Sequence, residues 1–150
     1  MNADTWMVHD HGSDWHVCAI IGIAHHLRRL GWETRTTDRI GNLEGVAGPE
    51  IDIRASRQDK YLNKTTGHWE TKQRIIGIEV EEQFERSTII RKWEQYRPYR
   101  LQTLYIATLS KVRGRPDFGM DEMGIRDIVL IKPDWRDFLG ACRLFAEAIL

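Results

Sequence analysis

The chain has 150 residues, of which 41% are hydrophobic and 29% are charged, a composition typical of one soluble domain with a sizeable core. Its 22 basic and 22 acidic residues balance, which excludes a globally basic nucleic-acid binder, so any such contact requires a local patch. No stretch is long and apolar enough to span a membrane and no signal-peptide core is present, so we expect a cytoplasmic protein without membrane partners.

Hydrophobic periodicity predicts three helices and five strands in one domain of residues 1–150, with a flexible lead-in at 1–12. The predicted elements are a helix at 14–30, strands at 32–37, 49–54 and 75–83, a helix at 87–97, strands at 101–109 and 128–131, and a helix starting at Pro133 or Asp134. The helix between the third and fourth strands favours parallel pairing of those strands. The fifth is apolar throughout and is expected to be central or covered on both faces. The pattern predicts an α/β fold of order αβββαββα with a mixed sheet of about five strands.

Two carboxylates stand two residues apart in the third predicted strand, at Glu79 and Glu81. Alternate strand residues point to the same face, and neighbouring carboxylates are costly to desolvate without a cation. If the second and third strands form an antiparallel pair, Asp52 joins them, and the three acids are suited to hold Mg²⁺, or Mn²⁺ in its place. The alternative is structural, with the acids facing solvent or pairing with Arg54 or Arg74.

These residues, Pro49-Glu-Ile-Asp52 and Ile78-Glu-Val-Glu81, resemble the PD-(D/E)XK nuclease superfamily, which includes many restriction endonucleases and Holliday-junction resolvases. The family pattern is an Asp on the second core strand and acid-x-Lys on the third. Over residues 14–110 the resemblance implies a restriction endonuclease-like core in which Asp52 and Glu79 ligate the metal. Glu81 stands where the family usually has Lys. Some members with Glu there are active, and Glu81 can act as a general base but cannot supply positive charge.

Four further residues are weaker candidates for this site. Family members often carry an acid on the first helix, and Asp14 and His16 are the nearest polar residues here. Glu50 shares a strand face with Asp52 and can substitute as a ligand, while Gln83 continues the face of Glu79 and can contact substrate. The resemblance implies a Mg²⁺-dependent DNA endonuclease, restriction- or resolvase-like, that acts on duplex or branched DNA as a homodimer.

The polar segment 55–74 is expected to form an extended hairpin with its turn at 63–67. Basic residues outnumber acids here and Tyr61 and Trp69 are interleaved, so it is either a DNA-contacting arm or a solvated hairpin. A second basic segment, 111–116, is either a phosphate contact or a solvated loop. The candidate DNA-binding residues are Arg57, Lys60, Lys64, Lys72, Arg74, Lys111, Arg113 and Arg115.

Three other interpretations remain open. The absence of the motif Lys favours a catalytically inactive nuclease fold that binds DNA or serves as a subunit of a complex. An unrelated α/β domain with ordinary ion pairs is also compatible with the pattern. The histidines near the N-terminus and Cys18 match no standard zinc spacing, so the histidines either form a metal site with Cys18 or are solvated or interface side chains. Cys18 and Cys142 lie in apolar helical patterns and are expected to be buried.

Overall fold

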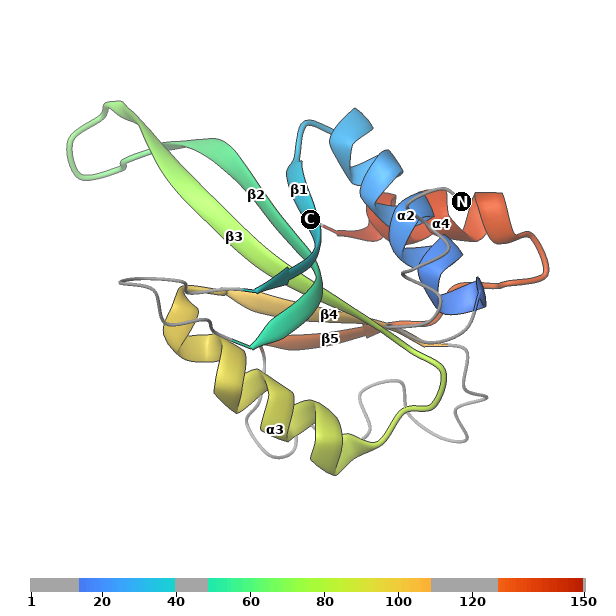
Figure 1. The fold of residues 1–150 in the computed structure, drawn as a ribbon. Coiled ribbons are helices and arrows are strands. Elements are labelled where there is room, and N and C mark those ends of the chain that lie inside the picture. Colours follow the sequence, from blue (N-terminus) through green and yellow to red (C-terminus); the bar gives the residue numbers. More distant parts are fainter. Residues whose placement is uncertain (1–13, 40–48, 109–126, 150) are drawn as a thin grey trace.

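The computed structural model describes residues 14–39, 49–108 and 127–149 (Figure 1). In chain order its elements are α2 (Asp14–Arg29), β1 (Glu33–Arg39), β2 (Glu50–Leu62), β3 (Trp69–Glu81), α3 (Arg86–Tyr96), the 3₁₀ helix η1 (Arg97–Tyr99), β4 (Thr103–Thr108), β5 (Ile128–Ile131) and α4 (Phe138–Ala148). The predicted α/β order is confirmed, with η1 added. The expected lead-in at 1–12 and the basic residues Lys111, Arg113 and Arg115 lie outside the described residues.

The five strands form one mixed sheet in the order β1-β2-β3-β4-β5. β1, β2 and β3 pair antiparallel, whereas β3, β4 and β5 pair parallel, which confirms the predicted crossover pairing. α2 and α4 cover one face and α3 covers the other (Figure 1). Among the described strands β5 lies at an edge and not in the centre. The other alternative, that β5 is covered on both faces, agrees with the packing: Leu130 packs toward the α3 side, and Val129 and Ile131 pack toward α2 and α4.

The sheet separates two hydrophobic clusters, one against α2 and α4 and one against α3. Ile51 and Ile53 are two residues apart on β2 but belong to different clusters, which indicates that β2 turns over between them. Ile51 packs over Gly77, where its Cδ1 occupies the space that a Cβ would take. A side chain at residue 77 would therefore displace the residue next to Asp52.

Local hydrogen bonds fix the end of α2 and the start of α4. α2 ends at Arg29, close to the predicted limit of 30, and Gly31 follows it with a φ of +92°. The Trp32 amide donates to the Leu27 carbonyl at 3.0 Å in a Schellman motif. α4 starts later than predicted, because Asp137 caps it by accepting a hydrogen bond from the Gly140 amide at 3.1 Å.

The two cysteines differ in exposure although both lie on packed helices. Cys142 of α4 is buried against Gly22 of α2, with its Sγ 2.8 Å from the position a Cβ would take. Cys18 is exposed, so the expectation that it is buried is wrong. The apolar pattern around Cys18 is produced by its neighbours Val17, Ala19 and Ile20, which are the residues that are buried.

β2 and β3 extend well beyond the other strands as a long hairpin (Figure 1). Both are longer than predicted, because the polar segment 55–74 continues the main-chain ladder as far as Leu62 opposite Trp69. The turn lies where it was expected: Asn63 Oδ1 accepts the Thr65 amide at 2.9 Å, and Gly67 has a φ of +73°. No helix in the described part of the chain is long and apolar enough to cross a membrane.

Candidate active site

The candidate site forms where β2 separates from β3. The two strands pair in regular register from Leu62–Trp69 to Ile53–Ile78. At the next residue, side-chain contacts replace the main-chain hydrogen bonds of the ladder. Asp52 Oδ2 accepts a hydrogen bond from the Val80 amide at 2.8 Å, and the Asp52 amide lies 3.4 Å from Glu79 Oε1. The opening of the ladder thus brings together two of the predicted carboxylates and fixes them against the backbone.

Glu79 is the most deeply buried carboxylate of this group, with 3% of its surface exposed. Burial and the neighbouring charge of Asp52 raise its pKa well above the ordinary range, although Lys92 and the Tyr96 hydroxyl act against the shift. The Tyr96 oxygen lies 2.8 Å from Glu79 Oε1 and 3.0 Å from the Glu50 carbonyl. Tyr96 has one hydroxyl proton for these two acceptors, so a proton on Glu79 satisfies both contacts.

Lys92 brings a positive charge to these acids from α3. Its Nζ lies 2.7 Å from Glu81 Oε1 and 3.2 Å from Glu79 Oε2. Burial alone would lower the pKa of Lys92, but the charges of Glu79 and Glu81 outweigh it and raise the pKa, so the ammonium is retained at neutral pH. The structure therefore places a lysine beside the position where the sequence has Glu81.

Sequence reasoning missed Lys92, which was not among the candidate site residues. The buried residues of α3 include Ile89, Trp93 and Tyr96. Lys92 completes the spacing i, i+3, i+4, i+7 with them and therefore shares their face. A lysine within an apolar helical face, next to a strand with two carboxylates, was the available signal.

His16 reaches the site from α2. Its Nε2 lies 3.2 Å from Asp52 Oδ2, and both side chains are largely buried. Burial lowers the pKa of His16, but the hydrogen bond to Asp52 and the charges of Asp52 and Glu81 more than compensate, so its pKa is raised. His16 can therefore carry charge and orient Asp52.

The other weak candidates contribute less. Asp14 is exposed in the first turn of α2. Glu50 supplies its main-chain carbonyl to Tyr96. The expectation that Gln83 continues the face of Glu79 is wrong, because β3 ends at Glu81 and Gln83 is exposed in the turn toward α3.

The basic residues of the hairpin do not form one patch. The pairing of Arg57 with Arg74 and of Asp59 with Lys72 puts these side chains on one face, and Lys60 points to the other. The guanidinium groups of Arg57 and Arg74 lie 4.3 Å and 5.7 Å from the Trp32 ring centroid. Lys64 lies in the exposed turn.

The donor chemistry of Asp52 and Glu79 fits a hard divalent cation. Within the described residues, no three His, Cys, Asp or Glu side chains are arranged as a ready metal cage. Mg²⁺ does not require one, because it usually binds through one or two carboxylates together with waters and substrate phosphates. Two adjacent carboxylates at an opening in the sheet meet that requirement.

Comparisons with known proteins assign no family to this chain. No protein-family model matches the chain, and no curated protein matches it significantly. The crystal structure of a protein of unknown function, AF1548, is similar with a TM-score of 0.48 and 19% sequence identity. The similarity covers 79% of this chain and 58% of that protein, so the chain spans less than two thirds of its length.

Proposed function

We propose that this protein is a Mg²⁺-dependent DNA endonuclease of restriction- or resolvase-like type, with Mn²⁺ as a possible substitute. The observation that carries the proposal is the position of Lys92, which reaches Glu79 and Glu81 from α3 beside Asp52. The PD-(D/E)XK pattern usually has a Lys near its two acids, and this sequence has Glu81 at that position of the strand. Lys92 supplies the positive charge from the following helix.

Asp52 and Glu79 would hold the metal, which when bound polarises a phosphoryl oxygen and acidifies a bound water. With the metal bound, Glu79 would be ionised, its proton passing to solvent, and the Tyr96 hydroxyl would donate to Glu79 Oε1 and fix the carboxylate. The Lys92 ammonium stabilises the negative charge that grows on the phosphate. As Lys92 turns to the phosphate, Glu81 Oε1 becomes available to accept a proton from the attacking water.

The test is cleavage of supercoiled plasmid, linear duplex and a four-way junction with Mg²⁺ or Mn²⁺. We expect strand cleavage by the wild type that is lost in Asp52→Ala and in Glu79→Ala. Glu94→Ala is the matched control, because Glu94 is an exposed acid of α3. If the wild type cuts none of these substrates with either metal, the endonuclease proposal is wrong.

A second candidate is a catalytically inactive protein that binds DNA or joins a complex through the same fold. It is favoured by the hydrogen bonds of Glu79, whose two oxygens contact Tyr96 and Lys92 as in a satisfied ion pair. Calorimetric titration with Mg²⁺ and Mn²⁺ separates the two. Binding that is lost in Glu79→Gln supports the enzyme, and the absence of divalent binding supports the inactive protein.

The oligomeric state belongs to the same proposal. Cutting both strands of a duplex requires two active sites, which a homodimer supplies through a twofold axis. Sedimentation velocity of the wild type with and without duplex DNA measures this. A strict monomer that only nicks DNA would contradict the dimer and leave the chemistry at Asp52 and Glu79 unaffected.

A further inference from the structure

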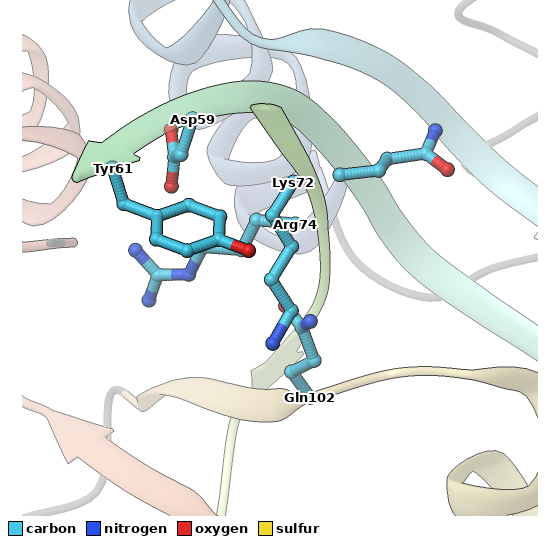
Figure 2. A pocket seen from close by; sticks show the side chains of 6 residues that line it. Asp59, Tyr61, Lys72, Arg74 and Gln102 are labelled. Carbon is cyan, nitrogen blue, oxygen red and sulfur yellow. The ribbon is translucent and has the colours of Figure 1, made fainter. Parts of the chain in front are cut away.

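A separate open cavity of about 500 Å³ lies between the hairpin and the start of β4 (Figure 2). Its lining residues are Asp59, Tyr61, Lys72, Gln73, Arg74 and Gln102. Lys72 is seven residues before Glu79 on β3, which corresponds to about 23 Å along the strand. The cavity is therefore distinct from the carboxylates of the candidate active site, and its volume suits a small ligand.

The charges around the cavity leave a cationic excess. Asp59 pairs with Arg57 at 2.7 Å. The Arg74 guanidinium donates to the Tyr105 hydroxyl at 3.0 Å, which holds it in place. Lys72 takes part in none of the ion pairs recorded among the described residues, so its ammonium is available to an anion.

The neighbouring carboxylate, Glu70, is also engaged. It accepts hydrogen bonds from the Tyr61 hydroxyl at 2.6 Å and from the Asn63 amide nitrogen at 2.9 Å. These contacts fix the Tyr61 ring, which is 43% exposed. The ring is consequently held at the cavity by its hydroxyl end while its face remains open to a ligand.

Gln102 faces the hairpin from the residue before β4 (Figure 2). Its Oε1 accepts the Ile75 amide at 3.2 Å, which fixes the orientation of the carboxamide and leaves its NH₂ group as a donor. An aromatic face, an amide and two cations are the groups that recognise a nucleobase together with its phosphate.

We propose that this cavity binds one nucleotide of a single-stranded segment of DNA. The base stacks on Tyr61, its edge meets Gln102, and the phosphate lies between Lys72 and Arg74. A base inside an intact duplex is stacked on both faces and cannot enter without being extruded. The inference rests on the proposed endonuclease function and narrows the substrate to branched, flapped or gapped DNA.

The test measures binding by fluorescence anisotropy in EDTA, so that cleavage plays no part. The probes are a labelled single strand of about 12 nucleotides, the same strand in a blunt duplex, and a nucleoside monophosphate as competitor. We expect the strand to bind more tightly than the duplex and the monophosphate to compete weakly. Tyr61→Leu weakens strand binding about tenfold, whereas Tyr61→Phe retains it because the ring face is kept.

The matched control uses the two faces of the hairpin. Lys72→Gln on β3 and Lys60→Gln on β2 remove the same charge from neighbouring rungs of the hairpin, but only Lys72 lines the cavity. We expect Lys72→Gln to weaken strand binding severalfold more than Lys60→Gln. Equal losses would mean diffuse attraction and overturn the proposal, as would equal affinity for duplex and strand.

A monophosphate that binds as tightly as the strand would assign the cavity to free nucleotides and would also overturn the proposal. The binding experiment and the cleavage experiment test the two proposals separately. Cleavage without strand preference overturns the cavity proposal alone, and strand preference without cleavage overturns the endonuclease alone. Urea unfolding of Tyr61→Leu verifies that the variant is folded.

Discussion

The two ends of the β2–β3 ladder are made of the same two strands but differ in main-chain pairing and in the exposure of their side chains. At the inner end, past Ile53, the main-chain ladder opens and carboxylates occupy the gap, with Glu79 only 3% exposed. At the outer end the ladder closes at Leu62 opposite Trp69, which is 71% exposed. Charge at the inner end is desolvated and strongly coupled, whereas charge at the outer end is screened by water.

The inner end of the hairpin contains a carboxylate whose burial lowers the stability of the fold. Burying Glu79 beside Asp52 raises its pKa, which is unfavourable for folding at neutral pH. Structural positions are rarely maintained at such a cost, and strongly shifted groups concentrate at functional sites. The outer end buries no comparable carboxylate, and its side chains are exposed, so they can contact a ligand.

The largest effect is expected from Lys92→Ala at the inner end. The change leaves Glu79 and Glu81 without their cation, so we expect destabilisation of about 2–3 kcal/mol. Cleavage should fall about a hundredfold or more, because one source of transition-state charge stabilisation is lost. Urea unfolding and plasmid cleavage rates measure the two effects.

Arg91→Ala is the control for this variant. Arg91 lies next to Lys92 on α3 and is exposed, so the same charge is removed outside the buried cluster. We expect a change of at most about 0.5 kcal/mol. Similar losses in the two variants would contradict the view that the inner end holds coupled, desolvated charge.

Glu79→Gln should stabilise the metal-free protein while abolishing cleavage. An acid whose pKa is raised on folding contributes stability that is present below its ordinary pKa of about 4.3 and is lost as the pH rises through the folded value. Glutamine does not titrate, so the variant should be more stable than the wild type near neutral pH. The gain should vanish below about pH 4.

Urea unfolding in EDTA across this pH range measures the difference between the two proteins. A constant difference between wild type and Glu79→Gln would mean that Glu79 does not titrate abnormally. Glu79→Ala serves as the steric control, since it removes the same charge but leaves a void and leaves the Tyr96 hydroxyl with the Glu50 carbonyl as its remaining partner.

Tyr96→Phe tests the hydroxyl that joins Glu79 to the Glu50 carbonyl. We expect a loss of about 1 kcal/mol, because two buried acceptors lose their shared partner. Cleavage should fall about tenfold, since Glu79 is no longer fixed in orientation. Tyr99→Phe, in η1 outside the carboxylate cluster, is the control and should leave both quantities nearly unchanged. If Tyr96→Phe changed neither stability nor the cleavage rate, Tyr96 would have no role in the site.

The sequence predicted the order of elements because α2, β3 and α3 carry strong apolar periodicities and Gly31 follows the end of α2. It also indicated that Asp52 and Glu79 would meet, given antiparallel pairing of their strands. It did not indicate the turnover of β2 between Ile51 and Ile53, because strict alternation assumes a regular strand. Lys92 was missed because a charged residue is by default assigned to the solvent side of a helix.

The smallest effect is expected at the outer end, from Trp69→Ser. Trp69 is 71% exposed and lies opposite Leu62 at the tip, so its removal should change stability by no more than about 0.5 kcal/mol. Urea unfolding at two protein concentrations measures this. A larger loss that depends on concentration would mean that a second copy covers Trp69, and the outer end would then be an interface whose aromatic side chains are not available to DNA.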